Sequence, residues 1–211
     1  MVSNELNFLE GLVYLCKKDK ILGKVIKEIK PEEPEKRDPN FEALVRIISG
    51  QQLSSAAAST IFKRLKEFLG KNEITPQLIK ECIPQQILKC GLSNAKTKYI
   101  LNLADFFLVE PNFLHELKDK ESKEIIEVLQ KIKGIGIWSA SIFSLFYLNH
   151  SDVFVWGDFS IKKAIRLLYE EDQEMEQERI IEITSKWTPY RSTECIVLWR
   201  WLDEGAIKFS K

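Results

Sequence analysis

The sequence has few of the residues that mark secreted, metal-binding or membrane proteins. Its 211 residues include four cysteines, Cys16, Cys82, Cys90 and Cys195, and no pair of them has the CxxC spacing of a zinc site. Nothing indicates the oxidising compartment in which disulfides persist, so we expect reduced, mostly buried thiols. No apolar run reaches about 18 residues, and the N-terminus does not resemble a secretion signal. We therefore expect an intracellular protein that does not contact a membrane.

A surplus of positive charge is also missing. The chain has 31 basic and 31 acidic residues, whereas nucleic-acid-binding proteins usually carry an excess of Lys and Arg. The charges are nevertheless separated. Residues 170–178, EEDQEMEQE, hold six acids and no base, and residues 86–104 hold Lys89, Lys96 and Lys98 and no acid. Each run is consistent with an ordinary solvated face, but a polarised surface with one basic side remains open.

No segment alternates apolar and polar residues as a half-buried β-strand would. Apolar residues instead recur every three or four positions in seven segments, at 6–15, 41–48, 61–69, 99–107, 125–132, 161–168 and 180–187. The fold class is therefore predicted to be all-α, with 45% apolar residues to form a core. Thr75 with Pro76 is typical of a helix start, and Gly91 of a helix end.

Two segments interrupt this helical pattern. The Pro-rich segment KPEEPEKRDPN, residues 30–40, is typical of a connector, and SDVFVWGD, residues 151–158, reads as a short extended piece. The first forty residues therefore form a helical arm in our interpretation, followed by a block from about 41 to 150.

Two glycines one residue apart stand out in KIKGIGIWSASIFSLF, residues 131–146. Gly134 and Gly136 allow positive φ and close backbone approach, so they predict a tight hairpin between two helices, the second beginning near Ile137. The free N–H groups and the dipole at the start of that helix form a site for one phosphate. Taken alone, the same residues are also consistent with a turn that only allows two helices to pack closely.

Four blocks of the sequence, in order and with compatible spacing, resemble the helix-hairpin-helix DNA glycosylases (the HhH-GPD superfamily), specifically the compact members of the DNA-3-methyladenine glycosylase II branch. The blocks are FEALVRIISGQQLSSAAASTIFKRL (41–65), GLSNAKTKYILNLADFF (91–107), LQKIKGIGIWSASIFSLFYLNHSDVFVWGDFSIKKAI (129–165) and WTPYRSTECIVLWRW (187–201). The resemblance implies one glycosylase unit over 1–211 with a cleft between two helical subdomains. Residues 41–150 would form the subdomain with the hairpin, and residues 1–40 plus 151–211 the other.

The resemblance assigns Asp158 as the catalytic residue, because it ends the element D-V-F-x-x-G-D that carries the family's catalytic aspartate. Its carboxylate would stabilise the oxocarbenium-like sugar as the base leaves, and would orient the attacking water. An alternative is a helix N-cap ahead of FSIKKAIRLL, and the two roles can coexist. Asp152 also matches a family position and is expected to have a structural part.

Tryptophans are the expected lining of the base pocket, because alkylated purines are cationic and favour aromatic faces. Trp138 stands where related bifunctional glycosylases carry a nucleophilic lysine, so the resemblance implies an enzyme without lyase activity. Trp199 and Trp156 complete the expected pocket. For Trp138 and Trp199 the alternative is an ordinary core position. Trp156 departs from the smaller residue or proline of many relatives, which leaves the shape of the pocket open.

A loop that wedges into the duplex is implied for SGQQLSSAA, residues 49–57, with Gln51, Gln52, Leu53 and Ser54 as its candidate residues. The last three are the candidates for the inserted side chain. The alternative takes Gln51 and Gln52 as helix-terminal residues and Leu53 as a core residue.

The hairpin is the expected phosphate site of the family. Backbone N–H groups at Gly134, Ile135 and Gly136 would contact phosphate, together with the Ser139 hydroxyl. Hairpin carbonyls of the family commonly hold an alkali-metal ion. No other metal or redox cofactor is expected, and no [4Fe-4S] cluster, since Cys195 stands alone in the C-terminal region.

The implied function is release of alkylated purines, such as 3-methyladenine and 7-methylguanine, from double-stranded DNA as the first step of base excision repair. We expect a monomer that acts on DNA in the nucleoid or nucleus. Three alternatives stay open: a monofunctional glycosylase for hypoxanthine or ethenoadenine, a catalytically silent helix-hairpin-helix DNA-binding module, and an α-helical protein-binding domain unrelated to DNA.

Overall fold

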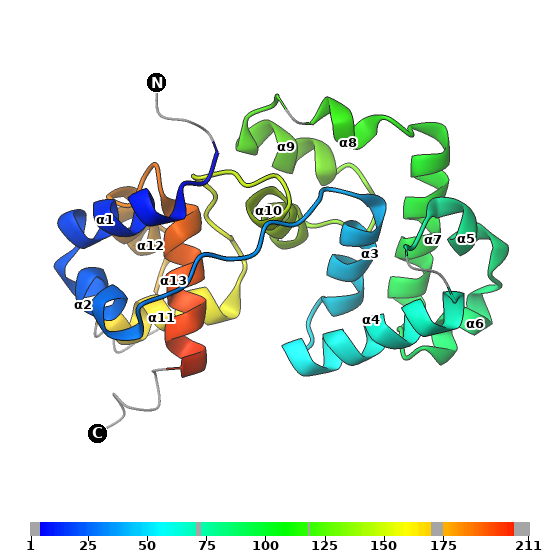
Figure 1. The fold of residues 1–211 in the computed structure, drawn as a ribbon, viewed down its shortest axis with the longest axis horizontal. Helices are drawn as coiled ribbons and strands as arrows, with labels where there is room; N and C mark the ends of the chain where they lie inside the picture. Colours follow the sequence, from blue (N-terminus) through cyan, green and yellow to red (C-terminus); the bar gives the residue numbers. More distant parts are fainter. Residues whose placement is uncertain (1–4, 71–72, 118, 170–174, 205–211) are drawn as a thin grey trace. The chain divides into compact units, whose positions relative to one another are not determined.

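The computed structural model describes residues 5–70, 73–117, 119–169 and 175–204. Within these ranges every regular element is a helix, and the β pairing is limited to one isolated bridge between Glu5 and His150 (Figure 1). The predicted all-α class is confirmed. None of the described helices is long and apolar enough to cross a membrane.

The chain divides into two compact units. The central unit is the continuous stretch Arg37–Leu148, and the terminal unit joins Met1–Lys36 to Asn149–Lys211. Both boundaries lie a few residues before the positions 41 and 150 that the connector and the extended piece suggest.

The described residues of the central unit form eight helices around one apolar core. Leu44, Ile48, Ile100 and Phe143 are among its fully buried side chains. The described helices are α3 (Phe41–Gly50), α4 (Ser55–Leu69), α5 (Pro76–Glu81), α6 (Pro84–Lys89), α7 (Asn94–Val109), α8 (Phe113–Glu116), α9 (Ser122–Leu129) and α10 (Ile137–Phe146).

The central unit has the predicted residues at the start of one helix and at the end of another. Thr75 caps α5, accepting a hydrogen bond from the Leu78 N–H with Pro76 at the first helical position. Gly91 follows the end of α6 with φ 103°, the positive φ that favours glycine after a helix.

The terminal unit has α13 in contact with three other helices. Its described helices are α1 (Phe8–Lys18), α2 (Lys20–Ile29), α11 (Phe159–Leu168), α12 (Gln177–Ser185) and α13 (Arg191–Glu204). Helix α13 packs against α1, α2 and α11. All side chains from Ser192 to Leu198 are buried, so α13 runs through the interior of this unit.

Asp19 ties the two ends of the chain together inside the terminal unit. Its carboxylate caps α2 and accepts hydrogen bonds from Tyr169, from Trp187 Nε1 at 2.9 Å and from Lys186 Nζ at 2.9 Å. Burial by itself raises the pKa of this carboxyl, but the hydrogen bonds, led by the one from Lys186, outweigh burial and lower it. Asp19 therefore stays ionised although its side chain is almost fully buried.

Candidate functional site

The extended segment before α11, residues 151–158, is hydrogen-bonded to the first turn of α13. Asp152 forms a bidentate ion pair with Arg191, with 2.7 Å from Nε to Oδ1 and 2.9 Å from Nη2 to Oδ2. The Ser192 hydroxyl donates to the His150 oxygen at 2.5 Å and accepts from the Val153 N–H at 3.0 Å. These bonds place the chain that leads to Asp158, so Asp152 has the structural part expected for it.

Asp158 is the N-cap of α11 and also contacts a tryptophan of α13. Its Oδ1 accepts from the Ile161 N–H at 2.9 Å and from Trp199 Nε1 at 3.2 Å. The capping interpretation is therefore right as a description of local structure. These two hydrogen bonds fix the direction of the carboxylate at the start of the helix. The arrangement holds one oriented anion beside an aromatic ring.

The three candidate pocket tryptophans are divided between the two units. Trp199 and Trp156 belong to the terminal unit and are half-buried, and the Trp156 ring meets Phe154 edge-on with centroids 4.6 Å apart. Trp138, on the first turn of α10, is half-buried and packs against the core of the central unit. The Trp199 ring is thus hydrogen-bonded to Asp158. Trp138 packs against the core of its unit, as in the alternative that takes it as a core position.

The two hairpin glycines have different roles. Gly134 has φ 103°, and a Cβ on it would lie 2.4 Å from the Tyr99 ring, so both conformation and space require glycine. Gly136 has φ −92°, and a Cβ there would meet no atom within 4 Å. The expectation that both glycines serve positive φ or close approach is therefore right for Gly134 and wrong for Gly136.

Gly136 instead caps α10 without a side chain. Helix α10 begins at Ile137, as predicted, and no side chain of the described ranges forms a capping hydrogen bond at its N-terminus. Its first N–H groups have no partner within the helix, and they carry the positive end of the helix dipole. The geometry needed for a phosphate at the start of α10 is present.

Gln51 connects the end of α3 to the hairpin. Its Nε2 donates to the Gly134 oxygen and to Ser139 Oγ, each at 2.9 Å. Ser139 is only 2% exposed. The Ser139 hydroxyl, expected at the phosphate, therefore faces Gln51 in this structure.

The turn between α3 and α4 exposes all three candidates for the inserted side chain, Gln52, Leu53 and Ser54. Gln52 is exposed at the left-handed φ of 56°, and Leu53 is 41% exposed. Ser54 caps α4, accepting from the Ala57 N–H at 3.4 Å. The alternative in which Leu53 belongs to the core is wrong.

Lys96 on α7 forms hydrogen bonds with the main chain at the end of α3 and in the turn between α3 and α4. Its ammonium donates to the main-chain oxygens of Ser49 and Gln51. Burial lowers the pKa of Lys96. Sequence reasoning placed Lys96 only in a basic run, and its partners lie more than forty residues away, so no local signal identified the contact.

Among the described residues there is no group of three or more His, Cys, Asp or Glu side chains able to hold a metal ion, and all four thiols are free. The hairpin offers main-chain oxygens instead. Those of Ile132 and Gly134 each accept one hydrogen bond, from the Ile135 N–H and from Gln51, and each keeps a second lone pair. Hard oxygens of this kind suit an alkali-metal ion.

Comparisons with known proteins identify the family of this chain. The family model described as HhH-GPD superfamily base excision DNA repair protein matches residues 45–189, more than half of the chain. DNA-3-methyladenine glycosylase 1 of Schizosaccharomyces pombe is 29% identical over 185 residues, covering 86% of this chain and 80% of the relative.

Two solved structures have closely similar folds. The Schizosaccharomyces pombe 3-methyladenine DNA glycosylase in complex with abasic DNA superposes with a TM-score of 0.82 at 24% identity, covering 93% of this chain and 98% of that one. A DNA-3-methyladenine glycosidase from Bacillus halodurans gives a TM-score of 0.78 at 29% identity, with coverages of 98% and 94%.

Proposed function

Because the chain belongs to the HhH-GPD superfamily of base excision DNA repair proteins, we propose that it is a DNA glycosylase for alkylated bases. Its substrates are 3-methyladenine and 7-methylguanine in double-stranded DNA. The observation that carries the proposal is the Asp158 carboxylate, held by the Ile161 N–H and by Trp199 Nε1. The names of the similar proteins agree with this substrate class.

Asp158 supplies the negative charge that the reaction needs. As the N-glycosidic bond breaks, its electron pair stays with the base, so a cationic alkylated purine leaves as a neutral molecule. The sugar becomes oxocarbenium-like, and a fixed carboxylate stabilises that positive charge. The same carboxylate orients the water that adds to the sugar carbon and accepts the proton that this water loses.

Base flipping provides access to the bond. In the proposal, one of the exposed residues Gln52, Leu53 and Ser54 in the α3–α4 turn fills the space that the base leaves. Gln51 and Lys96 support this turn from two sides. The N–H groups from Gly134 to Gly136 and the start of α10 hold a phosphate, and an alkali-metal ion on the hairpin carbonyls would add positive charge there.

Trp138 makes the proposed enzyme monofunctional. The side chain at this position is an indole and not an amine, so it has no nucleophile for a Schiff base with the sugar. The product is an abasic site in an intact strand. We further propose that the enzyme acts as a monomer on nucleoid or nuclear DNA.

The test is base release from methylated duplex DNA by the wild type and by Asp158→Asn. Asparagine caps helices about as well as aspartate but carries no charge, so the fold and DNA binding should persist while release is lost. Chromatography identifies the free bases, and electrophoresis with and without alkali separates abasic sites from nicks.

Three results contradict parts of the proposal. Strand cleavage without alkali contradicts monofunctional action. Release of hypoxanthine or ethenoadenine alone contradicts the substrate assignment. DNA binding without release of any base shows a silent binding module.

A further inference from the structure

A basic stripe with an aromatic residue at its head runs along one face of α11. The stripe consists of Phe159, Lys162, Lys163 and Arg166, which follow one another at spacings of three, one and three residues. Residues at i, i+3, i+4 and i+7 lie on the same side of a helix. The opposite side holds Ile161, Ala164 and Ile165 in the core.

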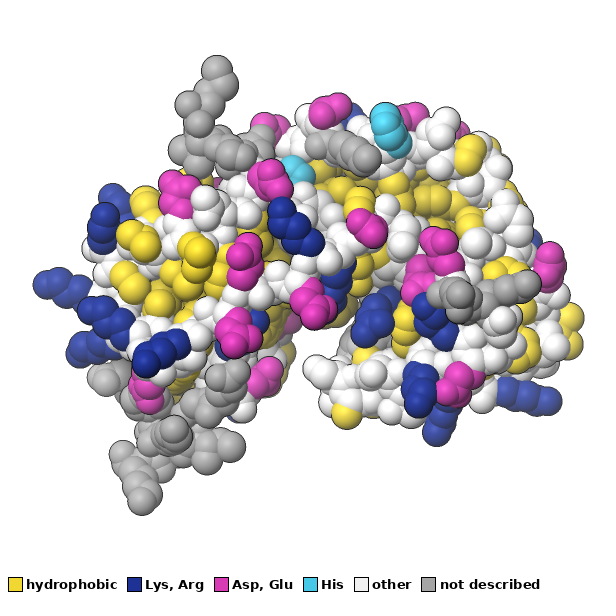
Figure 2. Space-filling view, viewed as in Figure 1, with side chains coloured by type: hydrophobic (Ala, Val, Ile, Leu, Met, Phe, Trp, Pro, Cys, Tyr) yellow, Lys and Arg dark blue, Asp and Glu magenta, His cyan; other side chains and the backbone are white. Residues whose placement is uncertain are grey.

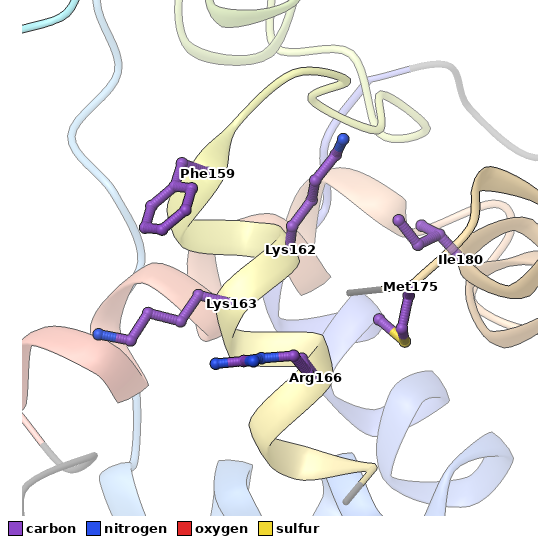
Figure 3. Close-up of a pocket in the computed structure, with 6 residues that line it drawn as sticks. All are labelled: Phe159, Lys162, Lys163, Arg166, Met175 and Ile180. Carbon is purple, nitrogen blue, oxygen red and sulfur yellow. The ribbon is translucent and has the colours of Figure 1, made fainter. Parts of the chain in front are cut away.

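The four stripe residues line a surface cavity of about 320 Å³ together with Met175 and Ile180. In Figure 3 they project from successive turns of α11, and Met175 and Ile180 lie across from that helix. The cavity therefore combines cationic side chains with an apolar lining.

The three cations of the stripe form no ion pair with any residue in the described ranges. Like charges one helical turn apart repel each other. Phe159 is 78% exposed although it is a large aromatic residue. Clustered cations beside an exposed ring fit a nucleic-acid strand, because phosphates neutralise the cations and nucleotides pack on the ring.

The stripe begins immediately after Asp158. Since a helix rises about 1.5 Å per residue, Lys162 and Arg166 lie roughly 6 and 12 Å farther along the axis. We propose that the stripe binds the phosphate backbone of the lesion-bearing strand next to the flipped nucleotide, with Phe159 packing on a neighbouring nucleotide. This inference rests on the proposed role of Asp158 in glycosylase action, and it adds a DNA contact independent of the hairpin.

A matched control is present in the same unit. Lys20, Lys24 and Lys27 are exposed along one side of α2, where Figure 2 shows Lys and Arg side chains standing out from the surface. The stripe variant combines Lys162→Gln, Lys163→Gln and Arg166→Gln. The control variant combines Lys20→Gln, Lys24→Gln and Lys27→Gln, with the same loss of charge. Melting temperatures of both variants equal to that of the wild type establish that neither set of substitutions unfolds the protein.

The measurement is fluorescence anisotropy with a duplex that contains an abasic-site analogue, titrated at several salt concentrations. For the stripe variant we expect the slope of log K against log salt to decrease in magnitude by about two to three, since each phosphate contact contributes about 0.9. The control should keep the wild-type slope. Phe159→Ala should weaken binding about 5-fold or more with an unchanged slope.

Base release by saturating enzyme separates this inference from the proposed function. If the wild type releases 3-methyladenine and the stripe variant binds DNA like the wild type, the stripe proposal fails and the glycosylase proposal stands. The stripe proposal is also overturned if the slope of log K against log salt decreases equally in both variants. Such a result would show that the effect comes from the net charge of the protein and not from the position of the cations. If the wild type binds DNA through the stripe but releases no base, the proposed function fails instead.

Discussion

The Lys96 ammonium lies 2.7 Å from the main-chain oxygen of Gln51 and 2.9 Å from that of Ser49. Both oxygens belong to the end of α3 and the turn that follows, where carbonyl groups lack helical partners. The positive charge also suits the negative end of the helix dipole. Since Gln51 reaches the hairpin from the same turn, Lys96 fixes the base of the proposed wedge loop.

Substitution of Lys96 by methionine should destabilise the protein by roughly 1.5 to 3 kcal/mol, because hydrogen bonds from a charged donor are lost and two carbonyls need new partners. Lys98→Met is the control, because Lys98 is exposed on the same helix. Urea unfolding of both variants tests the prediction. A free energy of unfolding that is equal in the two variants would contradict it.

The hairpin glycines should respond differently to alanine. Gly134→Ala should cost roughly 2 kcal/mol or more, because the Cβ meets Tyr99 and φ is positive. Gly136→Ala should cost less than about 1 kcal/mol, since the Cβ enters open space and only the cap preference is lost. Thermal unfolding of the two variants compares them directly, and equal costs would show that the hairpin adjusts around Gly134.

The capping and catalytic roles of Asp158 can be separated by two substitutions. Asp158→Ala should lower the free energy of unfolding by about 1 kcal/mol through loss of the cap, whereas Asp158→Asn should leave it nearly unchanged. Both variants should lose base release, because both lack the negative charge. Retained activity in the Asn variant, measured as free base from methylated DNA, would remove Asp158 from the proposed mechanism.

The buried carboxyl of Glu194 should make stability depend on pH. Its side chain is fully buried on α13, Oε1 has no hydrogen-bond partner in the part of the chain that the structure describes, and burial raises its pKa well above the ordinary value of 4.5. The folded state therefore keeps a proton that the unfolded state releases. Stability from this group is fully present below about pH 4.5 and is lost as pH rises toward the raised pKa, at up to about 1.4 kcal/mol per pH unit.

Glu194→Gln should remove this dependence, since an amide does not ionise. We expect the difference in melting temperature between variant and wild type to shift in favour of the variant from pH 5 to pH 8. Calorimetry at several pH values measures it. A difference that stays constant over this range would mean that Glu194 does not change its protonation on unfolding.

Several features of the fold were decided by short stretches of sequence. Thr75, Asn40 and Asp158 are N-caps because their side chains reach N–H groups three residues ahead. The apolar periodicity gave the correct class because helices such as α11 bury one side, here Ile161, Ala164 and Ile165. Helix α2 has a comparable signal, with Asp19 as its cap and apolar residues from Leu22 to Ile29 at helical spacing. It lies in the expected helical arm but not among the seven periodic segments.

The tertiary structure decided the contacts on which the candidate site depends. Gln51 and Gly134 are 83 residues apart, and Trp199 and Asp158 are 41 residues apart. Apolar periodicity also fails to identify α13. A helix that is buried on all sides has no polar face, so its apolar residues do not recur with the helical period.

The sequence by itself determined the all-α class, the caps and the order of family blocks, since these depend on neighbouring residues. Only the tertiary structure decided that Gly134 is required, because a Cβ there would meet the Tyr99 ring, and that Gly136 is not. It also decided that Gln51 donates a hydrogen bond to Ser139. Such contacts arise when helices distant in sequence pack together, and a single sequence does not encode their distances locally.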